Sequence, residues 1–214
     1  MLLDVFRRLH KAYGPQEWWP ADSPVEVVVG AILTQNTAWS NVRKAIRNLG
    51  EADCLGWAAL RDVPVPELER LIRPSGTFRV KAARLKSFVA ALWHDHGGDL
   101  GRLLSGPVAV ARQRLLRVPG VGPETADAIL LYAGNRRSFV VDAYTRRILR
   151  RHFILSNDDD YEATRALFQQ HLPHSARLYN EYHALLVAVG KRHCRGTAVC
   201  NGCPLSDLAH DERE

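Results

Sequence analysis

The segment of residues 115–152 constrains the fold most, because it joins two helical patterns through a turn that contains a pair of glycines. Gly120 and Gly122 are expected to let the backbone turn tightly and to take positive φ angles without a steric cost. Pro123 suits the first turn of a following helix, where its missing N–H costs nothing. The apolar residues after it recur at helical spacing: Ala126, Ile129, Leu130 and Ala133. We therefore predict a helical hairpin with a glycine turn.

The N-terminus of the second hairpin helix is a candidate site for a phosphate group. Backbone N–H groups point outward there, and the small residues of the turn let another backbone approach. A hairpin with a glycine turn but no ligand is the alternative. Asp142 directly follows the β-branched pair Val140-Val141. Its carboxylate is either an N-cap for a helix over 143–151 or a catalytic group, and one side chain is able to do both.

Residues 116–122, LRVPGVG, followed by Thr125-Ala126 and Val141-Asp142, resemble the helix-hairpin-helix GPD superfamily of DNA glycosylases, which includes endonuclease III. The resemblance implies an all-α fold of two helical domains, with a cleft between them that holds Asp142. In such a protein the hairpin grips the backbone of double-stranded DNA, the damaged base is flipped out, and the aspartate acts beside the sugar. Asp142 is then the catalytic residue. The hairpin residues implied as DNA contacts are Gly120, Val121, Gly122 and Thr125.

Position 124 departs from the pattern of the members that also cleave the DNA strand. Those members carry a lysine two residues after the second hairpin glycine, and its amine attacks C1′ to form a Schiff base, whereas this chain has Glu124. A carboxylate does not form an imine, so this route to AP-lyase activity is closed unless another lysine takes over. The resemblance therefore points to a monofunctional glycosylase that uses water as the nucleophile.

Within the superfamily, the chain is most similar to the 3-methyladenine DNA glycosylases of the endonuclease III type. The shared segments are WWP at 18–20, LTQNT at 33–37, RPSG at 73–76 and TADAIL at 125–130. By that match the residues that line the base pocket are Trp18, Trp19, Pro20, Trp39 and Lys191. Adjacent tryptophans are able to stack a flat base, although burial in the core is the alternative for large aromatic side chains.

An uncharged polar run at 34–37 follows an apolar helical pattern that starts with the capping signals Ser23, Pro24 and Glu26. The resemblance implies that Gln35 enters the gap left by the flipped base, and a polar cap at the helix end is the alternative. Thr77, in the turn 73–78, is a further candidate DNA contact.

Three of the four cysteines lie within ten residues near the C-terminus. Such clustering favours a metal centre over disulfides, and Cys54 is too distant in sequence to join it. Proteins similar to endonuclease III end in a loop whose four cysteines hold a [4Fe–4S] cluster, and here the fourth position is Ala209, next to His210. Three alternatives stay open: a cluster held with His210 or an outside ligand, loss of the cluster, or zinc with Cys₃His ligation. The candidate ligands are Cys194, Cys200, Cys203 and His210.

The formal charge of +6 fits a polyanionic partner such as DNA. The chain has no run of 18 apolar residues and no signal-peptide pattern at its start, so we expect a cytoplasmic, nucleoid-associated monomer with no membrane partner. The helical segments are expected to form one domain of six helices with the hairpin at 21–134. Residues 1–20 and 135–214 are expected to form a second helical domain with the cysteine loop.

Three functions are compatible with these patterns. The favoured one is a monofunctional base-excision-repair glycosylase for alkylated purines such as 3-methyladenine, because such cationic bases leave readily and one carboxylate suffices. The alternatives are an endonuclease III-like glycosylase and AP lyase for oxidised pyrimidines, and a DNA-binding module that recognises damage without catalysis.

Overall fold

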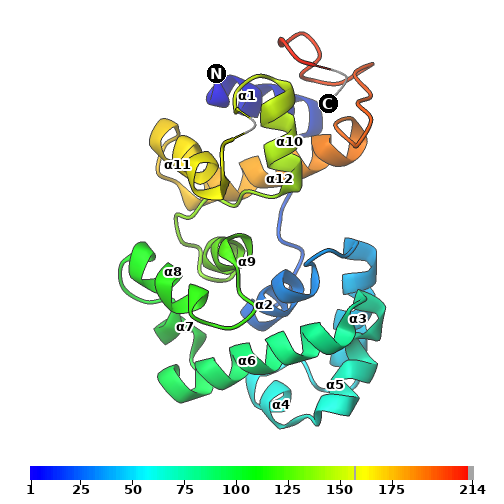
Figure 1. Ribbon diagram of the computed structural model, residues 1–214, viewed down its shortest axis with the longest axis vertical. Coiled ribbons are helices and arrows are strands. Elements are labelled where there is room, and N and C mark those ends of the chain that lie inside the picture. The colour runs from blue at the N-terminus through cyan, green and yellow to red at the C-terminus, as the bar shows by residue number, and fades with distance from the viewer. Residues whose placement is uncertain (157, 212–214) are drawn as a thin grey trace. The chain divides into compact units, whose positions relative to one another are not determined.

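The computed structural model describes residues 1–156 and 158–211, and these residues form helices and connecting loops (Figure 1). Across this part of the chain, the only strand-like pairing is an isolated bridge between Cys194 and Ala198. The predicted all-α fold is therefore confirmed. The chain divides into two compact units, one of Met1–Pro20 with Arg137–Glu214 and one of Ala21–Arg136.

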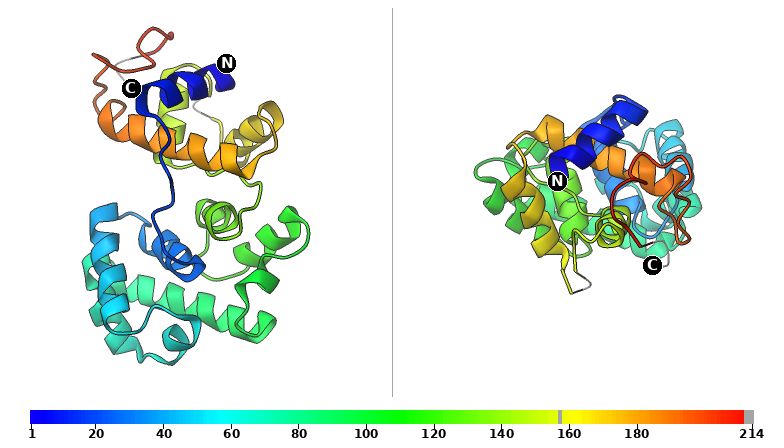
Figure 2. Two further views of the ribbon diagram at one scale, coloured as in Figure 1. Left: turned by 180° about the vertical axis from the view of Figure 1, so that it is seen from behind. Right: turned by 90° about the horizontal axis from the view of Figure 1, so that it is seen from above.

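The unit with both chain ends is built on α12 (Ala176–Arg192), which packs against α1 (Leu2–Tyr13) and α10 (Ala143–Arg151) (Figure 2). The fourth helix of this unit is α11 (Tyr161–His171). Aromatic rings fill the core: Phe139 stacks on Phe168 with ring centroids 3.8 Å apart, and Tyr182 meets both rings edge-on. The buried Tyr182 hydroxyl donates a hydrogen bond of 2.7 Å to the carbonyl of Leu2, which ties α12 to the start of α1.

The other unit is built around α2 (Pro24–Leu33), whose residues from Val27 onward are all buried. This helix is apolar on every side, which suits its place among α3 (Trp39–Glu51), α6 (Phe78–His96), α9 (Pro123–Ala128) and a π-helical segment (Ile129–Ala133). Its start follows the predicted capping pattern: Ser23 Oγ accepts the N–H of Glu26 at 3.2 Å, and Glu26 accepts the N–H of Asp22 at 3.0 Å. The other helices of the unit are α3 (Trp39–Glu51), α4 (Trp57–Asp62), α5 (Val65–Ile72), α6 (Phe78–His96), α7 (Leu100–Leu103), α8 (Val108–Leu116) and α9 (Pro123–Ala128), with a 3₁₀ turn at Arg73–Ser75.

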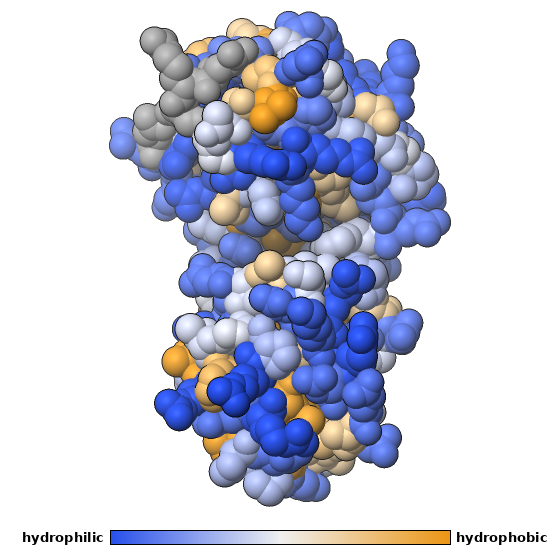
Figure 3. Space-filling model, turned by 90° about the vertical axis from the view of Figure 1, so that its right-hand side faces the viewer, coloured by the Kyte–Doolittle hydropathy of each residue, from blue (hydrophilic) through white to orange (hydrophobic). Residues whose placement is uncertain are grey.

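The predicted helix over 143–151 agrees with α10, and the second hairpin helix begins at Pro123, as predicted. One difference is that the second hairpin helix changes to π-helical geometry at Ile129–Ala133. Figure 3 shows a largely hydrophilic face on which hydrophobic side chains form small, separate patches. Within the described ranges, no helix has both the length and the apolar character needed to cross a lipid bilayer.

Candidate functional site

The predicted hairpin consists of α8, a turn and α9. Gly120 has φ +88°, and a Cβ atom on it would lie 2.3 Å from Cγ of Arg84, so glycine is required there. Gly122 differs from the prediction of a positive φ, because its φ is −90° and a Cβ on it would meet nothing within 4 Å. Gly122 is instead the extended N-cap residue of α9. The tight turn therefore depends on one glycine rather than two.

A buried ion pair joins the two hairpin helices. Asp127 on α9 is fully buried, and Arg112 on α8 donates to both of its carboxylate oxygens at 2.9 and 3.0 Å. A bidentate pair of this kind fixes orientation as well as distance. The side chains of the hairpin itself thus fix α8 and α9 relative to each other.

The side-chain amide of Gln35 lies against this hairpin. Its Nε2 donates to the carbonyl of Gly120 at 3.1 Å and to Oγ1 of Thr125 at 2.9 Å, while Arg84 donates to its Oε1. Sequence reasoning named Gln35, Gly120 and Thr125 separately as DNA contacts, and the structure brings them together. Gln35 therefore has a defined resting position next to the turn.

Lys81, which sequence reasoning missed, holds the polar run 34–37 in place. It is only 1% exposed, and its ammonium group donates to the carbonyls of Leu33 and Ser75 at 2.8 and 2.6 Å and to Oγ1 of Thr37 at 2.6 Å. Burial lowers the pKa of Lys81 from its usual value, and the nearby Arg84 lowers it further. Three oxygen partners nevertheless satisfy all three N–H donors of the charged form.

Asp142 is the N-cap residue of α10, as the sequence predicted. Its Oδ1 accepts the N–H of Thr145 at 2.7 Å, and its Oδ2 lies 3.7 Å from Nε2 of His183 on α12. The two side chains are 15% and 7% exposed, respectively. Burial lowers the pKa of His183, Asp142 opposes that shift, and Lys191 adds to it. The histidine is therefore neutral at pH 7, and the carboxylate has a fixed orientation beside it.

Three of the predicted base-pocket residues lie together in the same unit. The rings of Trp18 and Trp19 have centroids 5.4 Å apart at 60°, and Nζ of Lys191 lies 5.8 Å from the centroid of the Trp18 ring. Pro20 follows the tryptophans and is exposed. Trp39 belongs to the other unit, where it is half-buried at the first position of α3.

The remaining candidates are on the surface or in the hairpin turn. Glu124 is exposed in the first turn of α9, and Thr77 is exposed with φ +33° just before α6. Val121 is 6% exposed, so its side chain packs inward and only its backbone is available to a ligand.

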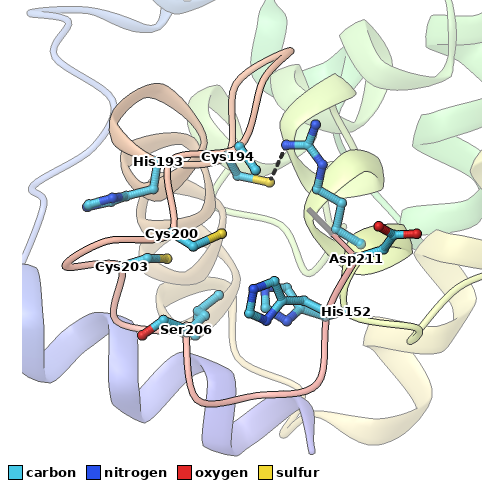
Figure 4. Close-up of a pocket in the computed structure, with 11 residues that line it drawn as sticks. His152, His193, Cys194, Cys200, Cys203, Ser206 and Asp211 are labelled. Carbon is cyan, nitrogen blue, oxygen red and sulfur yellow. Dashed lines mark hydrogen bonds between the residues drawn. The ribbon is translucent and has the colours of Figure 1, made fainter. Parts of the chain in front are cut away.

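The three clustered cysteines line one pocket in the unit that contains both chain ends, together with His152, His193 and His210. In Figure 4 the sulfur atoms of Cys194, Cys200 and Cys203 point toward a shared space, and the ring of His152 faces it from the other side. His152 was not a predicted ligand, because it lies far in sequence from the three cysteines. Across residues 1–156 and 158–211, no three Cys, His, Asp or Glu side chains are grouped to bind a single metal ion. Cys54 belongs to the other unit, as expected.

Arg151, the last residue of α10, contacts the cysteine loop, which we define as residues 193–211. Its guanidinium donates to Sγ of Cys194 at 3.2 Å and to the carbonyls of Arg195 and Gly196 at 2.6 and 2.7 Å. Its own carbonyl accepts the N–H of Asp211 at 2.8 Å. One helix therefore carries Asp142 at its N-terminus and the main contacts to the cysteine loop at its C-terminus.

Comparison with known proteins assigns the fold to a family. The model of the HhH-GPD superfamily of base excision DNA repair proteins matches residues 29–174. A protein of Methanocaldococcus jannaschii, provisionally named as a DNA repair glycosylase, is 42% identical over 209 residues, which cover 97% of this chain and 95% of the relative. Endonuclease III of Bacillus subtilis is 25% identical, over 88% of this chain and 82% of the relative.

Solved structures agree with this assignment. The 3-methyladenine DNA glycosylase of H. pylori bound to 1,N6-ethenoadenine has a TM-score of 0.74 and 25% identity, over 89% of this chain and 97% of that one. A non-covalent endonuclease III–DNA complex has a TM-score of 0.83 at 22% identity, over 98% and 95% of the two chains, and so supports the fold. The match over residues 29–174, the 42% identical relative and the hairpin geometry together show that the chain belongs to the HhH-GPD superfamily of base excision repair proteins and is a DNA glycosylase.

Proposed function

We propose that this glycosylase removes alkylated purines, such as 3-methyladenine, from double-stranded DNA by hydrolysis and does not cleave the strand. The observation that carries the proposal is the carboxylate of Asp142, which is oriented by the N–H of Thr145 and lies 3.7 Å from Nε2 of the buried His183. In this proposal the hairpin turn, with Gly120, holds the DNA backbone, and Gln35 leaves its resting position to fill the gap behind the flipped base.

Hydrolysis of the bond between base and sugar develops positive charge on the sugar ring. A fixed carboxylate stabilises that charge and is able to orient a water molecule or accept its proton. Because His183 is neutral, it does not cancel the negative charge of Asp142 by forming an ion pair. The Oδ2 atom, which is not the acceptor for Thr145, is the oxygen we assign to this role.

The preference for an alkylated purine rests on the leaving group and on the aromatic pair. A purine that carries an extra alkyl group on a ring nitrogen is cationic, so it departs without a further acid. The rings of Trp18 and Trp19 offer flat surfaces on which such a base could stack. The likeness to the H. pylori 3-methyladenine glycosylase supports this substrate class.

The proposal that the strand is not cleaved rests on position 124. Glu124 is an exposed carboxylate in the first turn of α9, and a carboxylate does not attack C1′ to give an imine. Endonuclease III-like lyase chemistry on oxidised pyrimidines therefore needs another lysine, and borohydride trapping detects the covalent complex that such a lysine forms.

The test is a panel of duplex DNAs that carry methylated purines or oxidised pyrimidines, incubated with the protein and analysed with and without alkali. We expect free methylated purine, strand breaks only after alkali, and no complex trapped by borohydride. Asp142→Asn should lower the single-turnover rate by about 10²–10³-fold, the typical loss when one group that stabilises the transition state is removed. Asparagine also caps helices well, so the melting temperature should change little.

Asp160→Asn is the matched control, because Asp160 caps α11 in the same way, with its Oδ1 accepting the N–H of Ala163 at 2.8 Å. This variant should keep the wild-type rate. A trapped covalent complex, or an Asp142→Asn variant as fast as the wild type, would contradict the proposed chemistry. Tight binding of lesion DNA without release of any base would favour the non-catalytic module instead.

We further propose that the cysteine pocket holds a [4Fe–4S] cluster rather than one zinc ion. A tetrahedral zinc with sulfur at about 2.3 Å would bring its ligand atoms to within about 3.8 Å of each other, and the described side chains show no such grouping. The thiols of Cys194, Cys200 and Cys203 instead surround a shared pocket, which suits a larger group. Such a cluster would stabilise the C-terminal loop, and hydrolysis needs no electron transfer from it.

A further inference from the structure

The proposed [4Fe–4S] cluster requires four protein or external ligands, one for each iron, and the pocket offers three thiols. The fourth donor must therefore come from another side chain that lines the same space, or from outside. The non-cysteine residues with donor atoms at this pocket are His152, His193, Ser206, His210 and Asp211. His193 is excluded because its ring points away from the sulfur atoms in Figure 4.

We propose that His152 is the fourth ligand of this cluster, through Nε2. Its ring faces the same space as the three sulfur atoms (Figure 4). Its Nδ1 lies 3.2 Å from the carbonyl oxygen of Ala209. A carbonyl oxygen only accepts hydrogen bonds, so Nδ1 carries the proton and Nε2 carries the lone pair. Histidine ligands of metals commonly have this arrangement, with the second ring nitrogen donating to a backbone carbonyl.

The backbone of His152 is fixed independently of the cysteine loop. It is the C-cap residue of α10, and its N–H donates to the carbonyl of Ile148 at 3.1 Å. The preceding residue, Arg151, already binds Cys194 Sγ and two carbonyls of the loop. His152 therefore approaches the pocket from a helix, opposite the thiols. The ring centroid of His210 lies 5.4 Å from that of His152, and its Nδ1 also lies near a backbone carbonyl, that of Leu208 at 2.7 Å. His210 differs in belonging to the loop itself, so the position of His152 at the end of α10 is what favours His152.

The proposal changes the charge of the centre. Three thiolates and a neutral imidazole leave one negative charge fewer than four thiolates do. Because exchange of cysteine for histidine raises the reduction potential of iron–sulfur centres, the wild-type cluster should be easier to reduce than that of His152→Cys.

The experiment uses the full chain, purified without oxygen after growth on [15N]histidine, with iron and sulfide measured and the reduced cluster examined by pulsed electron paramagnetic resonance. We expect a histidine-nitrogen coupling in the wild type and in His210→Ala, and its loss in His152→Ala. His152→Cys should keep all four irons, lack the coupling and have a lower reduction potential than the wild type.

Two results would overturn the assignment. A coupling that survives in His152→Ala, or disappears only in His210→Ala, leaves the cluster in place and removes His152 as its ligand. A wild-type protein that binds no iron and sulfide removes both the cluster and the ligand. The inference rests on the proposed cluster and not on the proposed substrate, because base release from methylated DNA is measured separately and needs no electron from the centre.

Discussion

At the scale of single residues, the pair formed by Asp142 and His183 connects the proposed catalytic carboxylate to a buried histidine. A histidine this deeply buried is expected to stay neutral, because desolvation lowers its pKa more than the carboxylate raises it. The charged groups that affect His183 are Asp142, which favours its protonation, and Lys191, which disfavours it. Neutral His183 thus leaves the carboxylate its full charge while filling the space beside it.

His183 should also make the stability of the protein depend on pH. Its folded pKa lies below the unfolded value, so below about pH 6.5 the unfolded chain binds a proton that the folded chain does not, and the free energy of unfolding falls as pH decreases. His183→Gln removes this titration. Its loss of stability between pH 7 and pH 5 should be shallower than that of the wild type, by up to about 1.4 kcal/mol per pH unit.

Urea denaturation at a series of pH values measures this difference. His174→Gln, at an exposed position in the same unit, is the control and should keep the wild-type slope. Equal slopes for the wild type and His183→Gln would show that folding does not lower the pKa of His183, and the effect of burial described here would then be refuted.

At the scale of elements, the hairpin offers a direct comparison of its two glycines. Gly120→Ala forces a side chain into a positive φ and against Arg84, so we expect a loss of about 1–3 kcal/mol in the free energy of unfolding. Gly122→Ala, at φ −90° with open space around it, meets no steric conflict and should cost less, up to about 1 kcal/mol, because alanine is a poorer N-cap than glycine. Chemical denaturation of both variants checks this, and equal losses would contradict the conformations described for the turn.

Lys81 joins three elements: the end of α2, the turn at Arg73–Ser75 and α6. Lys81→Met keeps a side chain of similar length but removes the donor to the buried carbonyl of Leu33, whereas the carbonyl of Ser75 still accepts the hydroxyl of Thr37. One unsatisfied buried group costs about 1–3 kcal/mol, so we expect a loss of about 1–3 kcal/mol in the free energy of unfolding, measured by urea denaturation. Lys44→Met, at an exposed site on α3, should be nearly neutral, and similar effects of the two changes would refute the role given to Lys81.

The sequence predicted what short-range chemistry determines. Capping by Ser23 and by Asp142 needs only partners three residues away, and both were found. The prediction of a positive φ at Gly122 was wrong, because glycine permits a positive φ but does not require one. Only the packing of Arg84 against Gly120 distinguishes Gly120 from Gly122. Lys81 and His183 were missed because their partners come from other parts of the chain. In the sequence Lys81 is one of several basic residues of α6, and His183 is a single histidine in a mostly apolar stretch of α12.

At the scale of the whole molecule, each unit has its own buried core. The core of one is the aromatic cluster around Phe139, and that of the other surrounds α2. Asp142 and the cysteine pocket belong to the first unit and the hairpin to the second. A change in the cysteine loop is therefore expected to reach Asp142 by way of α10, and not by way of the hairpin.

Removal of the proposed cluster tests this separation. Cys203→Ser should lower amide protection against hydrogen exchange in the cysteine loop and the last turn of α10, because Arg151 connects the two through its side chain and its carbonyl. The hairpin helices α8 and α9 should keep their protection, since local opening is confined to the cooperative unit that loses contacts. Cys54→Ser, in the other unit, is the control and should leave the loop unchanged. Equal protection of the loop in wild type and Cys203→Ser would mean that no metal centre stabilises it, whereas loss of protection in α8 and α9 would show that the two units unfold together.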